Sequence, residues 1–109
     1  MTKYLISFSS ATMQLADEDF EAVVESSHEA IREAKAAGVY VFAGGINEDV
    51  APILVHPDGS ATPETSHLDG GFCVLEVATR AEAEQWAARI ASGCRTPQEL
   101  REFQYDPES

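Results

Sequence analysis

The sequence predicts an α+β protein with a ferredoxin-like fold, in which one antiparallel sheet carries two helices on one face. Three observations lead to this class. The 109 residues suffice for a single domain, residues 1–109, with one core. Hydrophobic residues make up 44% of the chain and charged residues 24%, as in ordinary globular proteins. The hydrophobic periodicity gives the order strand, helix, strand, strand, strand, helix, strand, which resembles two split βαβ halves.

The first expected strand is residues 3–8, where apolar residues alternate. Tyr4, Ile6 and Phe8 fall on one face, and Leu5 and Ser7 on the other.

A helix is expected over residues 16–38. Asp17 is the predicted N-cap, acids fill the first turn, and Gly38 is the predicted C-cap. The residues at helical spacing, which we expect to form the buried stripe, are Phe20, Val24, Ser27, Ile31 and Ala34.

Two strands and a loop follow. Residues 39–45 are β-branched and aromatic and end in a glycine pair, which predicts a strand running into a turn. A short apolar strand is expected around residues 53–55, where His56 is expected to be a solvent-facing strand terminus. The Pro-, Asp- and Gly-rich loop after it is suited to carry the lip of a pocket.

The second half repeats the pattern of strand and helix. Residues 70–77 form a nearly continuous apolar strand, and Thr79 with Glu82 has the spacing of a capping box. The helix over residues 81–91 is predicted to bury Ala83, Trp86, Ala87 and Ile90. Residues 97–105 return to strand-like spacing, with Leu100 on one face and Phe103 and Tyr105 on the other.

Two helices cover only one face of such a sheet, whereas several strands are apolar on both faces. Leu5, Val39 or Tyr40, and Phe103 therefore need a second cover. We expect a second copy of the chain to supply it, sheet against sheet, which predicts a homodimer.

The formal charge is −12, from 19 acidic and 7 basic residues. Such a chain repels a phosphate backbone and an anionic membrane surface, so we expect neither nucleic acid nor a membrane as partner. No apolar run approaches the roughly 20 residues that span a bilayer. The N-terminal residues do not have the pattern of an export signal, which predicts a cytoplasmic protein.

The two cysteines, Cys73 and Cys94, fit neither a disulfide framework nor a zinc pattern. We expect two reduced thiols, with Cys73 in the core and Cys94 partly exposed after the second helix. No metal-binding spacing of histidines and acids is present, and we predict no metal and no cofactor.

Two segments, SHEAIREAKAAGVYVFAGG (residues 27–45) and GGFCVLEVATRAEAEQWAARIA (residues 70–91), resemble the YCII-related family. This family of small dimeric α+β barrel proteins also contains the DGPF-type domains. The resemblance extends over nearly the whole chain and implies the same dimeric barrel. It also implies a histidine and aspartate acting as an acid/base pair. By position His28 matches the family histidine, and Asp49, or else Glu48, matches the acid.

His28 lies beside the apolar stripe of the first helix, where a histidine can reach a pocket between helix and sheet edge. Held by a carboxylate, such a ring can act as a general base at neutral pH. The alternative is a histidine of the surface or core edge with no catalytic role.

A second candidate pair is His67 and Asp69, just before the glycine-backed strand, where a loop can carry chemistry. The alternative is that both are ordinary polar residues at the end of a loop. Together with Ser7, these two residues are the predicted binding residues.

The sequence therefore leaves three functions open. The first is an acid/base enzyme of lyase, isomerase or dehydrohalogenase type that uses His28 and Asp49 on a small cyclic or aromatic molecule. The second is a dimeric module that binds a small ligand or a protein without catalysis. The third, a monooxygenase-like use of the barrel, rests on analogy of fold alone.

Overall fold

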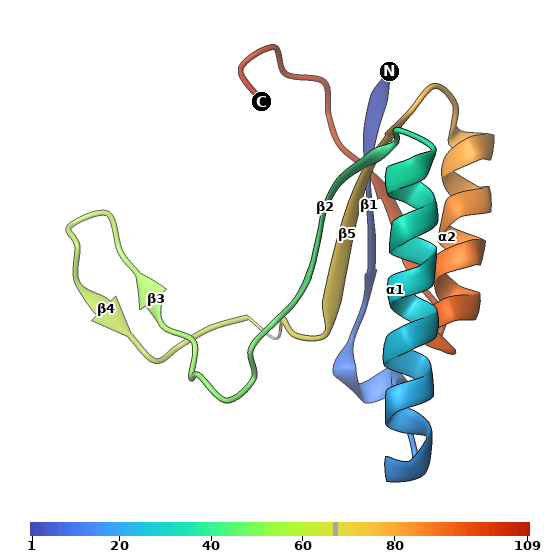
Figure 1. Ribbon diagram of the computed structural model, residues 1–109. Helices are drawn as coiled ribbons and strands as arrows, with labels where there is room; N and C mark the ends of the chain where they lie inside the picture. The colour runs from blue at the N-terminus through green and yellow to red at the C-terminus, as the bar shows by residue number, and fades with distance from the viewer. Residues whose placement is uncertain (67) are drawn as a thin grey trace.

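The computed structural model describes residues 1–66 and 68–109 as an antiparallel sheet with two helices on one face (Figure 1). The strands lie in the order β2-β5-β1-β6. The helices are α1 (Phe20–Ala36) and α2 (Arg80–Cys94), and the strands are β1 (Thr2–Phe8), β2 (Tyr40–Gly45), β5 (Gly71–Val77) and β6 (Glu99–Glu102). This arrangement agrees with the predicted α+β class and is compatible with a ferredoxin-like fold.

The alternation predicted for β1 is confirmed, and β5, predicted as a nearly continuous apolar strand, also alternates between buried and partly exposed residues. In the β1–β5 pair Tyr4 lies opposite Leu75 and Ile6 opposite Cys73, and all four side chains are buried beneath the helices. The intervening residues point to the other face of the sheet, which we call the open face. Because buried and partly exposed side chains alternate along both central strands, one face of the sheet is buried under the helices and the other face has no helix on it.

The first helix begins later than predicted. Asp17–Asp19 forms a 3-10 turn, closed by the bond from the Asp19 amide to the Ala16 carbonyl, and Asp19 rather than Asp17 is the N-cap. The predicted stripe is also wrong at its start, because Phe20 is 59% exposed. The residues that α1 buries completely or nearly so are Val23, Ala30 and Ala34.

Close contact between the helices explains this stripe. The Ser26 hydroxyl donates to the Gly93 carbonyl of α2, and a Cβ on Gly93 would lie 2.8 Å from the Ser26 carbonyl oxygen. Only small residues such as Ala30 fit at this crossing. Phe20 is exposed for a different reason, since it begins α1 where the helix extends past the end of the sheet (Figure 1).

The second helix follows the prediction at its start and not at its end. The Thr79 hydroxyl accepts a hydrogen bond from the Glu82 amide (3.2 Å), and Ala83, Ala87 and Ile90 are buried. Contrary to expectation, the helix continues through Cys94, which is only 7% exposed, and ends at Arg95 with a φ of 55°. Gly93 is thus a contact point within the helix and not its end.

The last strand is shorter than predicted. It ends at Glu102, and the Phe103 amide still donates to the Lys3 carbonyl (2.9 Å) before the chain leaves the sheet. Leu100 packs against the core as expected, whereas Tyr105 is 84% exposed.

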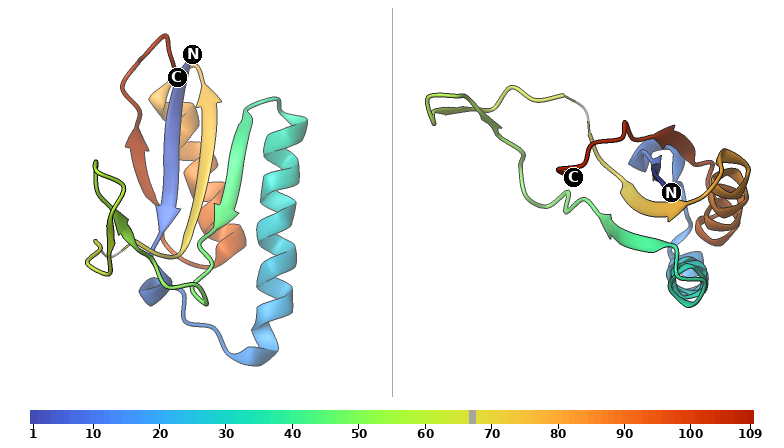
Figure 2. Two further views of the ribbon diagram at one scale, coloured as in Figure 1. Left: turned by 90° about the vertical axis from the view of Figure 1, so that its left-hand side faces the viewer. Right: turned by 90° about the horizontal axis from the view of Figure 1, so that it is seen from above.

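The short strand expected near residue 54 forms a hairpin apart from the main sheet. β3 (Leu54–Val55) pairs with β4 (Ala61–Thr62), and the turn between them is closed by the Asp58 carboxylate, which accepts from the Ser60 amide. His56, expected to face solvent, is half-buried and bonds Thr62 Oγ1 through Nε2 (3.0 Å). We call residues 46–66 the arm. Figure 1 and the right-hand view of Figure 2 show it standing away from the sheet on the side opposite the helices.

Candidate functional site

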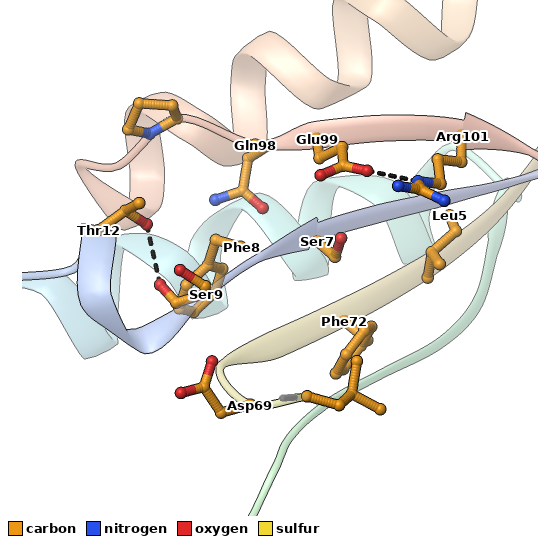
Figure 3. A pocket seen from close by; sticks show the side chains of 12 residues that line it. Leu5, Ser7, Phe8, Ser9, Thr12, Asp69, Phe72, Gln98, Glu99 and Arg101 are labelled. Atoms are coloured by element: carbon orange, nitrogen blue, oxygen red, sulfur yellow. Dashed lines mark hydrogen bonds and ion pairs between the residues drawn. The ribbon is translucent and has the colours of Figure 1, made fainter. Parts of the chain in front are cut away.

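A pocket lies on the open face, at the end of the sheet where β1 stops and β5 and β6 start (Figure 3). Its cavity volume is about 610 Å³, within the range of small-molecule sites. The lining comes from four segments that are distant in sequence: Leu5 to Thr12, Leu68 and Asp69, Phe72, and Pro97 to Arg101. The strand order β5-β1-β6 brings these segments together.

Strand alternation determines which side chains line this pocket. Ser7 of β1 lies between its cross-strand partners Phe72 of β5 and Glu99 of β6, and Leu5 lies opposite Arg101. Leu5 and Phe72 provide an apolar floor, while Ser7 places a hydroxyl between them and the charged edge strand. The pocket is therefore apolar at its base and polar toward β6.

The Asp69 carboxylate is fixed at the rim of the pocket. Oδ1 accepts from the Ser10 amide (3.0 Å), and Oδ2 accepts from the Ser10 hydroxyl. Gly70 follows with a φ of 82°, and a Cβ there would lie 2.0 Å from the Phe8 carbonyl oxygen. The glycine thus lets the loop carrying Asp69 approach the end of β1.

A buried threonine holds the opposite rim. Thr96 is 4% exposed, and its hydroxyl donates to the Thr12 carbonyl (3.1 Å), which ties the 3-10 turn Ser10–Thr12 to the segment before β6. Thr12 in turn donates its hydroxyl to the Ser9 carbonyl (2.9 Å; Figure 3). These bonds fix two of the four lining segments relative to each other.

β6 contributes two charged side chains to the pocket, Glu99 and Arg101. Arg101 Nε donates to Glu99 Oε1, and both side chains are largely exposed, at 73% and 58%. An exposed pair of this kind adds little stability, since water screens it. The guanidinium and the carboxylate therefore remain accessible to a ligand that carries either charge.

The predicted catalytic residues lie elsewhere. His28 is exposed on α1, and Asp49 is exposed in the arm, where its amide donates to Asn47 Oδ1 (3.1 Å). Within the described residues, no hydrogen bond or ion pair joins the two, and neither lines this pocket. His28 lies off the buried stripe of α1, which has its contacts at Val23, Ala30 and Ala34, and so points away from the core.

The predicted binding residues fare differently. Ser7 of β1 and Asp69 of the loop before β5 both line the pocket. His67 lies outside the described residues.

Four polar residues at the pocket were not predicted from the sequence: Ser10, Gln98, Glu99 and Arg101. Period-two alternation in residues 97–105 placed Glu99 and Arg101 on one face, but nothing in the sequence gave the β1–β6 pairing that brings them beside Ser7.

Comparison with known proteins adds no family. No protein-family model and no curated protein matches the chain. In residues 1–66 and 68–109, no helix is long and apolar enough to cross a membrane. The same residues hold no group of three or more His, Cys, Asp or Glu side chains arranged for a metal ion.

Proposed function

We propose that this protein is a homodimeric module, of the YCII-related type, that binds a small molecule in the pocket of the open face. The observation that carries this proposal is the pocket itself, where the apolar floor of Leu5 and Phe72 meets the fixed carboxylate of Asp69 and the exposed Arg101. Apolar walls with a few oriented polar groups are typical of ligand sites.

The lining favours a cyclic or aromatic molecule with a polar substituent. A flat apolar ring fits against Phe72 and Leu5, and Arg101 offers a planar pair of donors to a carboxylate. Ser7 and Gln98 add neutral hydrogen-bonding groups between the two. Small aromatic acids and lactones are therefore the first compounds to test.

A thermal-shift screen of these compounds tests the proposal. A ligand at 100 times its Kd raises the free energy of unfolding by about 2.7 kcal/mol, which is a clear increase in Tm. Ser7→Phe fills the pocket and should abolish the shift, whereas Ser92→Phe, on the exposed surface of α2, should retain it. A ligand whose shift persists in Ser7→Phe binds elsewhere and contradicts the pocket assignment, as does a panel without any shift.

The homodimer is supported by the charge and polarity of the open face. Its apolar side chains, Leu5, Phe42, Phe72 and Val74, lie on three adjacent strands. The charges at its ends are balanced, since Lys3 lies opposite Glu76 on the neighbouring strand and Arg101 forms an ion pair with Glu99 of its own strand. A chain of net charge −12 thus presents a face without excess charge, as interfaces generally do.

A second candidate function is acid/base catalysis of lyase, isomerase or dehydrohalogenase type. The observation favouring it is the Asp69 carboxylate, which Ser10 holds at both oxygens beside the cavity. If a turnover assay is found, Asp69→Asn should reduce kcat at least tenfold, and His28→Ala should leave it unchanged. The opposite result would favour the predicted pair of His28 and Asp49.

A further inference from the structure

We propose that the arm, residues 46–66, packs against the open face of a second copy of this chain. The proposal rests on the homodimer proposed above and adds to it a second contact, made by a segment that the sheet-to-sheet packing does not include. Each protomer would then contribute an arm and receive one, as a two-fold axis requires.

The first argument is the surface area of the single chain. A folded monomer of 11.8 kDa exposes about 5,900 Å² by the usual scaling with mass. This chain exposes 7613 Å². The difference of about 1,700 Å² exceeds the roughly 800 Å² that each partner buries in a stable dimer.

The second argument is the shape of the molecule. The radius of gyration is 15.6 Å, whereas about 13 Å is typical for this length. The arm contributes to this extension, because it stands away from the sheet in Figure 1 and in the right-hand view of Figure 2. The excess surface is therefore concentrated where a partner can cover it.

The third argument is the composition of the arm. Val50, Ile53 and Val55 are 65%, 63% and 61% exposed, and Leu54 is 43% exposed. A hairpin with two residues in each strand is marginal by itself in water and needs a surface to pack on. An apolar surface on the same side of the molecule is the open face, where Phe42 is 57% exposed.

Charge decides between arm-to-face and arm-to-arm contact. The arm carries Glu48, Asp49, Asp58 and Glu64 and no lysine or arginine, so two arms in contact would repel each other. The open face has balanced charges, since Lys3 lies opposite Glu76 and Arg101 is paired with Glu99, so it does not repel an acidic arm. The occupant that fits the arm is thus the open face of a second copy.

The dimer dissociation constant tests this proposal, measured by analytical ultracentrifugation of the full chain. The double variant Ile53→Ser, Val55→Ser should raise Kd at least tenfold, because the lost contacts lie in the interface. Phe20→Ser is the matched control, since Phe20 is equally exposed but lies on α1, and it should change Kd less than twofold. Far-UV circular dichroism checks that each variant is folded.

The outcomes separate the two proposals. A wild-type chain that is monomeric at 100 µM overturns the homodimer and the arm contact together. A second outcome is a dimeric wild type whose Kd rises in Phe42→Ser but not in the double variant Ile53→Ser, Val55→Ser. This outcome supports the sheet-to-sheet dimer and contradicts the arm contact. Isotope-filtered NOEs in a mixture of labelled and unlabelled chains give a direct readout. Contacts between chains from the Leu54 methyls to the Phe42 or Phe72 ring support the proposal, and a dimer without them contradicts it.

Discussion

At the scale of single residues, the glycine pair at the start of β5, Gly70 and Gly71, is a steric requirement of the site. A Cβ on Gly71 would lie 2.6 Å from the Phe8 ring, and one on Gly70 would meet the Phe8 backbone. The ring can move, but the backbone of β1 cannot move without breaking its pairing. Gly70 is therefore the stricter of the two positions, and the placement of Asp69 depends on it.

Gly70→Ala should lower the free energy of unfolding by about 3 kcal/mol or more, because a left-handed φ and a backbone clash add together. Gly59→Ala in the arm is the matched control, since Gly59 has a φ of 88° and no atom within 4 Å of its Cβ position. It should cost only about 1 kcal/mol. Urea unfolding measures both values, and equal losses would show that backbone strain alone matters.

Burial of the thiols predicts a dependence on alkaline pH. Desolvation raises the pKa of Cys73 to about 11 from a usual value of 9.0, and the nearby Cys94 adds a smaller effect in the same direction. Between pH 9 and 11 the unfolded chain loses this proton while the folded chain keeps it. The free energy of unfolding should therefore fall as pH rises through this window.

The control for this effect is Cys73→Ala, which removes the titrating thiol. Its free energy of unfolding should fall less steeply between pH 9 and 11 than that of the wild type, although it starts lower because of the lost packing. Denaturant unfolding at intervals of half a pH unit measures the two slopes. Identical slopes would mean that Cys73 does not contribute.

At the scale of secondary-structure elements, the contact between α1 and α2 sets the position of both helices over the sheet. Ser26 and Gly93 meet at this contact, with the Ser26 hydroxyl bonded to the Gly93 carbonyl. The small residues Ala30 and Ala34 fill the space between helix and sheet. Helix packing at this distance tolerates no additional side-chain volume.

Gly93→Ala should destabilise the protein by about 1–3 kcal/mol, since the helices must separate to admit the methyl group. Elsewhere in a helix the same change stabilises by roughly 1 kcal/mol, because alanine has the higher helix propensity. Ser92→Ala, on the exposed side of α2, is the control and should be neutral or slightly stabilising. A gain of stability in Gly93→Ala, seen as a higher Tm, would show that the contact is not tight.

At the scale of the whole molecule, one face of the sheet is covered by both helices. In the described part of the chain no helix covers the other face, and the C-terminal tail reaches one end of it, where Lys3 Nζ donates to the Ser109 carbonyl (Figure 2). The pocket, the apolar side chains of β1, β2 and β5, and the arm all lie on this second side. Burial of about 800 Å² or more per chain on this side of the sheet would add substantially to the free energy of unfolding of the dimer.

Stability should therefore depend on protein concentration. If folding is coupled to dimerisation, Tm should rise as the concentration increases from 1 to 100 µM, by mass action. Phe42→Ser should reduce this dependence, while Phe20→Ser should not. Differential scanning calorimetry measures Tm at each protein concentration. A wild-type Tm that is independent of concentration would contradict the homodimer.

The sequence by itself determined the order of the two helices and of the four strands of the main sheet, the alternation of β1, and the buried face of α2, but not strand β4 or the alternation of β5. These features depend on residues close together in the chain, whose periodicity of two or 3.6 is set by backbone geometry. Ser7 and Asp69 were predicted as binding residues, and both line the pocket.

Only the tertiary structure decided which segments that are distant in sequence lie next to each other. The pairing of β1 with both β5 and β6 brings Ser7, Phe72 and Glu99 into one row, and the Thr12–Thr96 bond joins residues 84 positions apart. The predicted stripe of α1 was wrong at Phe20 because this residue begins the helix, where α1 extends past the end of the sheet (Figure 1). Contacts between distant segments depend on shape complementarity across the fold, and no local periodicity encodes them.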